Sequence, residues 1–150
     1  MRGILILMIE AIEIADVMGG PAVLGCDVNS LHDLAEAVSG GLPKNALKKT
    51  VQRVSTKAAD VNTLVYRIVP EATYKRRTRL TASESERTER LARVIATAEY
   101  VWDSKADAHR WLGLAHPELD GKTPIHCAMS ELGARQVEEL LDKIFYGLSA

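Results

Sequence analysis

The last helical stretch of the chain indicates its fold class: residues 131–147 read ELGARQVEELLDKIFYG. Apolar residues recur here at intervals of three and four, which places them on one face of a helix. These residues are Ala134, Val137, Leu140, Leu141 and Ile144. Gly147 follows the last of them, and glycine is the residue that most readily ends a helix. We therefore predict a final helix with one buried face.

The segment ahead of this helix has local signals of its own. Leu119-Asp120-Gly121 predicts a turn, because glycine tolerates the positive φ that many turns require. Thr123 followed by Pro124 predicts a helix start. The threonine hydroxyl can accept a hydrogen bond from the first turn, and proline fits the first helical position.

The first third of the chain is also predicted to be mainly helical. Residues 4–18 predict a helix that Gly19-Gly20-Pro21 ends. Residues 22–25 are too short to classify and are compatible with an extended strand. Asn29 or Ser30 is expected to cap the next helix, which should end at residues 39–41.

The middle of the chain continues with short helices. One is expected to begin at Pro43, and Ser55 or Thr56 should cap the next. Pro70 separates that second helix from a short basic helix over residues 71–77. These segments keep helical spacing throughout, and none has the alternation expected of a strand.

Further on, Ser83 and Glu86 have the spacing of a capping box, which predicts a long helix over residues 84–102. Asp103 or Ser104 should cap another helix that ends at Leu112. The whole pattern predicts an all-α fold.

Length and composition narrow the class of protein. A chain of 150 residues forms one ordinary domain or two small ones on a shared core. Cys26 and Cys127 are far apart, so we expect small, buried or half-buried apolar side chains in a reducing compartment rather than a disulfide or a metal site. The apolar run over residues 4–9 is too short to cross a bilayer and has no cleavage site after it. We expect a soluble, cytoplasmic protein.

Charge is distributed unevenly along the chain. The net charge is −1 overall, but it is −5 over residues 1–42, +8 over residues 43–79 and −4 over residues 80–150. A basic middle segment between acidic flanks suggests that one face meets phosphate while the flanks meet protein.

The basic helix is the candidate DNA-reading element. Two short helices separated by a tight turn, with cations on the second, form a candidate helix-turn-helix. Arginine and lysine reach base edges and phosphates most readily. The candidate contacts are Thr73, Tyr74, Lys75, Arg76, Arg77 and Arg79. The alternative is a solvated charged turn, and Ile68 at the turn, where glycine is common, argues against close base readout.

Catalysis by this chain is not expected. The four histidines are isolated, and His32-Asp33 and His126-Cys127 are neighbours in sequence, which on a helix point in different directions. No metalloprotease, serine hydrolase or paired-cysteine motif is present. We expect no enzyme activity, no cofactor and no metal.

The end of the chain is apolar. Phe145, Tyr146 and Leu148 lie among its last six residues. They either fold back on the core or offer an apolar plug to a partner.

Several short motifs follow one another in a particular order over residues 30–150. They are Gly41-Leu42-Pro43, Ala46-Leu47, Arg76-Arg77, Leu80-Thr81, residues 84–87, 90–94, 108–112 and 117–124, and the stretch from Gly133-Ala134 to Tyr146-Gly147. Their order resembles the Xre/MbcA/ParS-type antitoxins, and in particular the Xre antitoxins that accompany RES-domain toxins. The chain departs from that pattern at His116, where Asn usually precedes the proline, and at Ile125-His126, where Leu-Asp is common.

The resemblance implies a cytoplasmic type II antitoxin that binds and masks a RES-domain toxin, an enzyme that destroys NAD⁺. It also implies repression of its own operon by binding operator DNA, a homodimer and a higher-order complex with the toxin. We expect dimerisation in residues 1–40, the helix-turn-helix in residues 41–80 and toxin binding in residues 81–150. The toxin-facing residues would be Arg135, Glu138, Phe145, Tyr146, Gly147, Leu148, Ser149 and Ala150.

Two further expectations follow. The apolar helix from Ile4 to Val17 would form the dimer, and the tail from Tyr146 to Ala150 would reach the toxin's active site. The competing interpretation is a free-standing helix-turn-helix regulator with a helical partner-binding domain.

Overall fold

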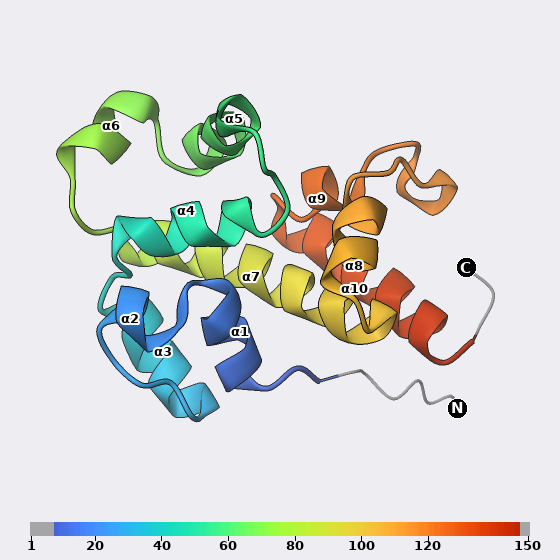
Figure 1. Cartoon of the computed structure of the whole chain (residues 1–150), viewed down its shortest axis with the longest axis horizontal. Coiled ribbons are helices and arrows are strands. Elements are labelled where there is room, and N and C mark those ends of the chain that lie inside the picture. The colour runs from blue at the N-terminus through green and yellow to red at the C-terminus, as the bar shows by residue number, and fades with distance from the viewer. Residues whose placement is uncertain (1–7, 148–150) are drawn as a thin grey trace.

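The computed structural model describes residues 8–147, and within them it is built from helices alone (Figure 1). The α-helices are α1 Ala11–Val17, α2 Gly20–Leu24, α3 Leu31–Ser39, α4 Lys44–Gln52, α5 Ala58–Ile68, α6 Glu71–Arg76, α7 Ala82–Trp102, α8 Lys105–Leu112, α9 Pro124–Cys127 and α10 Glu131–Phe145, with one 3₁₀ helix, η1 Pro117–Leu119. The predicted all-α fold is confirmed.

The long helix α7 runs through the middle of the molecule (Figure 1). Helices α1, α3, α4, α8 and α10 all pack against it. Nine of its 21 residues are buried, among them Leu91, Val94 and Ile95. One continuous core therefore serves both halves of the chain.

The start of α7 differs from the prediction. Thr81, not Ser83, is the cap: its hydroxyl accepts a hydrogen bond from the Glu84 N–H at 3.1 Å. The Glu84 carboxylate in turn accepts one from the Thr81 N–H at 2.9 Å. Thr81 has extended backbone, whereas Ser83 already lies inside the helix. The predicted capping box of Ser83 and Glu86 is therefore wrong by two residues.

The N-terminal part also differs in detail. The predicted helix over residues 4–18 begins at Ala11, residues 8–10 are not helical, and residues 1–7 lie outside the described residues. Residues 22–25 belong largely to α2 and are not a strand. Gly19 has φ of +108°, which lets the chain turn sharply, and Pro21 lies in the first turn of α2.

Most of the predicted caps are confirmed. The Ser30, Ser104 and Thr123 hydroxyls accept hydrogen bonds at the starts of α3, α8 and α9. Helix α5 is an exception beside α7, because it starts after Lys57 without a side-chain cap. Ser55 and Thr56 lie too far upstream in the loop to serve its first turn.

The final helix matches the prediction closely. Helix α10 covers Glu131–Phe145 and is followed by Gly147 at φ of +69°. Its predicted apolar face is buried except for Ile144, which is half-buried. Asp120 and Gly121 both have positive φ, as the predicted turn requires. Cys127 is buried as expected, but Cys26 is exposed because it lies in the loop after α2.

No helix within residues 8–147 combines the length and the apolar character needed to cross a membrane.

A short pairing between distant segments fixes the position of α6. The Leu80 N–H donates to the Leu42 carbonyl at 2.8 Å, and the Lys44 N–H donates to the Thr78 carbonyl at 3.1 Å. The Leu42 N–H donates to the buried Ser85 hydroxyl at 2.8 Å. The segment that leaves α6 is thereby held beside the segment that enters α4.

Candidate functional site

Helix α6 has the placement of a second helix in a helix-turn-helix. It follows α5 after a turn of two residues, Val69 and Pro70, and none of its own residues is fully buried. Tyr74 is its main attachment to the rest of the molecule. The Lys44 ammonium donates to the Tyr74 carbonyl at 2.8 Å and lies 4.9 Å from the centre of the Tyr74 ring. Tyr66 of α5 contacts the same ring edge-on, with ring centres 6.1 Å apart.

Tyr74 is therefore mostly occupied by internal contacts. Its hydroxyl lies 3.4 Å from the Lys44 carbonyl, to which it donates. Burial, with a smaller contribution from Tyr66, raises the pKa of the Tyr74 hydroxyl above its ordinary value. Thr73 beside it is half-buried. Tyr74 therefore holds α6 against α4 and α5 and presents little free polar surface.

The predicted cations differ in how free they are. Lys75 forms an ion pair with Glu71 at 2.6 Å, and this hydrogen bond raises the pKa of Lys75. Arg77 donates twice to the Glu84 carboxylate, at 2.8 and 3.2 Å.

Two further cations complete the set. Arg79 donates twice to the Gly41 carbonyl, at 3.1 and 2.9 Å. Arg76 is exposed, and no residue of the described chain pairs with it. Arg76 is thus the predicted residue that is most available for DNA.

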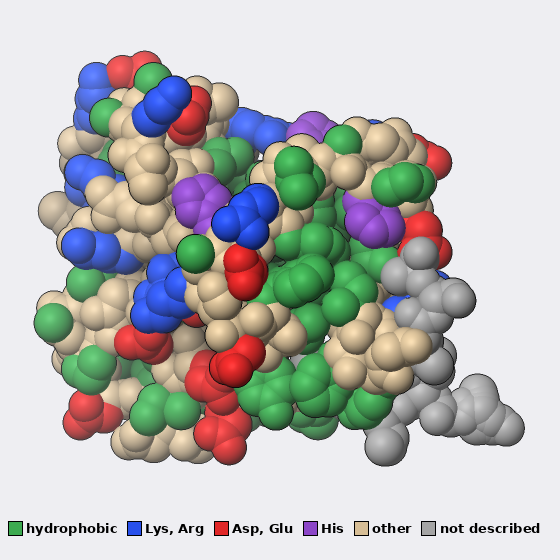
Figure 2. All heavy atoms as spheres, turned by 45° about the vertical axis from the view of Figure 1, so that its right-hand side comes forward, with side chains coloured by type: hydrophobic (Ala, Val, Ile, Leu, Met, Phe, Trp, Pro, Cys, Tyr) green, Lys and Arg blue, Asp and Glu red, His purple; other side chains and the backbone are tan. Residues whose placement is uncertain are grey.

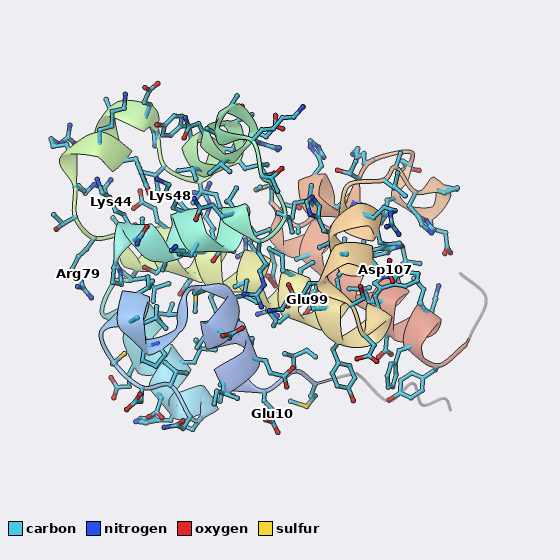
Figure 3. All side chains as sticks on the ribbon, in the orientation of Figure 1. Glu10, Lys44, Lys48, Arg79, Glu99 and Asp107 are labelled. Atoms are coloured by element: carbon cyan, nitrogen blue, oxygen red, sulfur yellow. The ribbon has the colours of Figure 1, made fainter. Side chains whose placement is uncertain are left out.

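Helix α4 adds two lysines that are not among the predicted DNA contacts. Lys44 and Lys48 are one helical turn apart and lie on the side of α4 that faces α6 (Figure 3). Lys48 is exposed. Of the labelled acids, Glu10 and Asp107 lie far from these lysines in the same view, and Glu99, near the middle, pairs with Arg53 directly after α4. The i, i+4 spacing of the two lysines was a readable sequence signal.

The opposite end of the molecule carries exposed aromatic rings. Phe145 and Tyr146 at the end of α10 are 41% and 43% exposed, and their ring centres are 5.0 Å apart. Tyr100 of α7 is 49% exposed and lies 5.5 Å from the Phe145 ring. We call Tyr100, Phe145 and Tyr146 the aromatic cluster. On the side of the molecule that Figure 2 brings forward, hydrophobic side chains form a continuous region.

The aromatic cluster bears on the two expectations for the tail. Phe145 contacts both Tyr100 and Tyr146, so this end of the helix is partly folded back, yet the rings keep a substantial exposed surface. Sequence reasoning missed Tyr100, because only the packing of α10 on α7 brings it to Phe145.

The remaining candidate residues of α10 have internal partners. Arg135 pairs with Glu131 at 3.5 Å on an exposed surface. Glu138 pairs with Arg93 of α7 at 3.0 Å, and Arg93 also pairs with Glu89 at 3.0 Å. Gly147 ends the helix, while Leu148, Ser149 and Ala150 lie outside the described residues.

No cluster of three or more histidine, cysteine or acidic side chains suited to a metal ion occurs in the part of the chain that the structure describes.

Both halves of the chain match domains of known proteins. Residues 33–93 match the antitoxin Xre-like helix-turn-helix domain, and residues 97–147 match the antitoxin Xre/MbcA/ParS C-terminal toxin-binding domain. A curated relative, Antitoxin Xre of Pseudomonas putida, is 37% identical over 84 residues. That match covers 53% of this chain and 53% of the relative, so the chain spans about half the length of the relative it matches. The chain belongs to the Xre-type antitoxin family.

The two matches agree with the order predicted from sequence, a helix-turn-helix part followed by a toxin-binding part. Helices α5 and α6 lie inside the first match, and the aromatic cluster lies inside the second. The limits of 1–40, 41–80 and 81–150 stay a prediction, as do the roles of the individual site residues.

Proposed function

We propose that this chain neutralises a NAD-degrading RES-domain toxin by binding and covering its active site, and that it represses its own operon through the helix-turn-helix. It does so as the antitoxin of a type II system in the cytoplasm. The proposal draws on the toxin-binding domain match, on the name of the Pseudomonas putida relative and on the motif resemblance described above.

The aromatic cluster is the observation that carries the toxin-binding half of the proposal. Aromatic side chains dominate the binding energy of many protein interfaces, because they bury a large area at low cost in conformational entropy. Helix α10 has six buried residues and ends at Phe145. The packing of the helix therefore fixes the position of Phe145. A partner that covers Tyr100, Phe145 and Tyr146 would gain most from this preorganised end.

The mode of neutralisation follows from that position. In the proposal, the residues from Tyr146 to Ala150 enter the toxin's active site and exclude its substrate. This mode needs no chemistry from the antitoxin, so we propose a protein that acts by binding and not as an enzyme.

The DNA-binding half draws on α6 and α4. Arg76 and Lys48 are exposed, and Lys44 lies next to α6. In the proposal, α6 enters the major groove while cations of α4 contact phosphates. Because Arg77 and Arg79 have internal partners, base readout rests mainly on Arg76.

Dimerisation is proposed for residues 1–40, with one adjustment. Ile14, Ala15 and Val17 of α1 are buried in the chain's own core, so they cannot form a dimer surface without opening it. Met8, Ile12 and Leu31 are 81%, 52% and 73% exposed, and a second copy could cover these apolar side chains. The higher-order complex with the toxin would build on that dimer.

Co-expression tests the proposal directly. The gene beside this one is expressed alone and with the antitoxin, while growth and cellular NAD⁺ are followed. We expect arrest with loss of NAD⁺, and rescue by the antitoxin. A Phe145→Ala, Tyr146→Ala variant should rescue less. The control Leu132→Ala, which truncates an exposed side chain at the other end of α10, should rescue fully. Absence of toxicity, or toxicity that the antitoxin does not relieve, would favour a free-standing regulator.

A further inference from the structure

A groove between the end of α5 and the α9–α10 segment is lined by basic and hydrogen-bonding side chains. Its volume is about 430 Å³, and Arg67, Lys122, His126, Ser130 and Gln136 are among its lining residues. No carboxylate is among the described residues that line it. The groove joins the two matched domains, since Arg67 lies in the first match and the other four lie in the second.

Arg67 is the central group of this groove. Its Nη1 lies 3.4 Å from His126 Nδ1, and it forms no ion pair within residues 8–147. A guanidinium stays charged at all ordinary pH values, and here its neighbour is an imidazole rather than an acid. A second guanidinium approaches the same end of α5, because Arg87 Nη2 donates to the Arg67 carbonyl at 3.2 Å.

The nearby acids have other positions or partners. Glu131 at the start of α10 pairs with Arg90 at 3.0 Å and with Arg135 at 3.5 Å. Asp120 belongs to the exposed turn beside Lys122 and does not line the groove. The positive charge in the groove is therefore not neutralised from within the groove.

The remaining wall suits an anion as well. Ser130 and Gly133 belong to the cap and first turn of α10, a helix of 15 residues whose N-terminal end carries partial positive charge. The Gln136 amide can donate hydrogen bonds, and either imidazole nitrogen can do so, depending on the tautomer.

We propose that this groove binds a phosphate group, held by Arg67, Lys122 and His126. A planar guanidinium fork beside a lysine suits the several oxygens of a phosphate. The phosphate belongs either to a DNA backbone or to a free phosphate compound. The DNA source rests on the proposed function. It would extend the DNA contact from the helix-turn-helix onto the toxin-binding domain, so that both domains hold the same duplex.

The first experiment titrates the full-length chain with inorganic phosphate at constant ionic strength and follows backbone amide and histidine NMR signals. We expect shifts concentrated at Arg67, Lys122, His126, Ser130 and Gln136. The Arg67→Gln variant should weaken the apparent affinity roughly tenfold, the loss of one charge-assisted contact. The matched control Arg110→Gln changes an exposed arginine of α8 that already pairs with Asp107, and it should leave the affinity unchanged.

A second variant tests the charge of the groove without removing Arg67. His126→Asp places a carboxylate beside the guanidinium, so an internal ion pair should replace the phosphate and abolish the localised shifts. His126→Gln keeps a hydrogen-bonding side chain without the negative charge and should weaken binding only slightly. Thermal unfolding of each variant shows whether the fold is retained, as expected for side chains that are exposed.

The second experiment identifies the source of the phosphate. Binding to operator DNA is measured against salt concentration for the wild type, Lys122→Gln and the matched control Lys105→Gln. If the source is DNA, Lys122→Gln should reduce the salt slope by about one, and Lys105→Gln should not. If DNA binding is unchanged while the localised phosphate shifts persist, the source is a free phosphate compound.

Other outcomes would overturn the proposal. Phosphate shifts spread evenly over all cationic surfaces, or equal in the wild type and Arg67→Gln, would show no site. Weaker toxin binding by Arg67→Gln, with no localised phosphate shift in the wild type, would assign the groove to an acidic toxin segment. A wild type that binds no DNA would refute the proposed repression, and the phosphate titration would still decide the site.

Discussion

At α6 the fold uses most of the cationic side chains for internal contacts, whereas at the end of α10 it leaves three aromatic rings partly exposed. Lys75, Arg77 and Arg79 each have a partner within the chain, and Arg76 stands out as free. The aromatic rings contact one another and still keep more than 40% of their surface accessible. A charged residue in a candidate site is available only if no internal acid or carbonyl reaches it, but an aromatic ring can contribute to the fold and to an interface at once.

The two regions also differ in how firmly they pack on the rest of the chain. The largest change in stability should come from a buried residue that packs α10 on α7. Leu141 is fully buried between α10 and α7, so Leu141→Ala should destabilise the chain by about 3 kcal/mol through lost burial and a cavity. Urea unfolding measures the change. Leu132→Ala on the same helix is the control, because Leu132 is 72% exposed and should cost less than about 0.5 kcal/mol. Equal losses would mean that α10 does not pack as described.

The aromatic cluster should produce the next largest effect, on toxin affinity rather than on stability. Phe145→Ala should weaken toxin binding by about 2 kcal/mol, roughly 30-fold, as expected for an aromatic anchor. Tyr100→Ala should do the same to a smaller extent, although it lies on a different helix. Calorimetry of the purified complex measures both. If Tyr100→Ala binds like the wild type, the toxin contacts α10 alone.

A smaller effect should separate the two neighbouring arginines of the basic segment. Arg76→Gln should lower DNA affinity by about 1 kcal/mol and reduce the salt slope by about one, because Arg76 is free to contact phosphate or base. Arg77→Gln should change DNA binding less and instead lower stability by less than about 1 kcal/mol, since it loses a partly exposed ion pair with Glu84. Fluorescence anisotropy and thermal unfolding give the two readouts. The reverse pattern would mean that Arg77 leaves Glu84 when DNA binds.

The smallest effect concerns pH at the start of α7. Burial raises the pKa of Glu84, but hydrogen bonds from Thr81 and Arg77 outweigh it, so the net pKa lies below its ordinary value of about 4.5. The ionised Glu84 carboxylate therefore stabilises the folded chain above that pH, and this contribution is lost as pH falls through the lowered pKa. We expect the free energy of unfolding to fall by about 1 kcal/mol or less.

Variants show the sign of this pH effect. Glu84→Gln should remove that pH-dependent loss from urea unfolding curves measured in acid. Glu89 provides the contrast, because burial raises its pKa despite Arg93. A raised carboxyl pKa favours the folded state as pH falls, so Glu89→Gln should change the pH profile in the opposite direction. The same sign for both variants would contradict these environments.

Elements with local causes were predictable from sequence. The caps Ser30, Ser104 and Thr123 accept hydrogen bonds from N–H groups three residues away in sequence. Helix α10 is predicted by the helical spacing of its own apolar residues. The start of α7 was harder, because Thr81 with Glu84 and Ser83 with Glu86 have the same spacing. The choice depends on where the backbone stays extended, and the distant pairing of Leu80 with Leu42 decides that.

The sequence predicts the types of residue in the candidate site, but it does not predict which of their side chains are free of internal partners. Arg79 is occupied by the carbonyl of Gly41, which is 38 residues away in sequence. Tyr100 joins Phe145 only because α10 packs on α7. Periodicity within one helix carries no information about such contacts between distant segments. The sequence therefore predicts Arg77 and Arg79 as free cations and gives no sign of Tyr100.

The continuity of α7 has a consequence for recombination between antitoxins. The two domain matches meet at residues 94–96, in the middle of this helix. A chimera joined there has no flexible linker to absorb a mismatch in length. One inserted residue would rotate everything downstream by about 100°. That rotation would turn the face of Val94 and Ile95 out of the core, so exchange of toxin specificity requires donors that preserve helical phase across the junction.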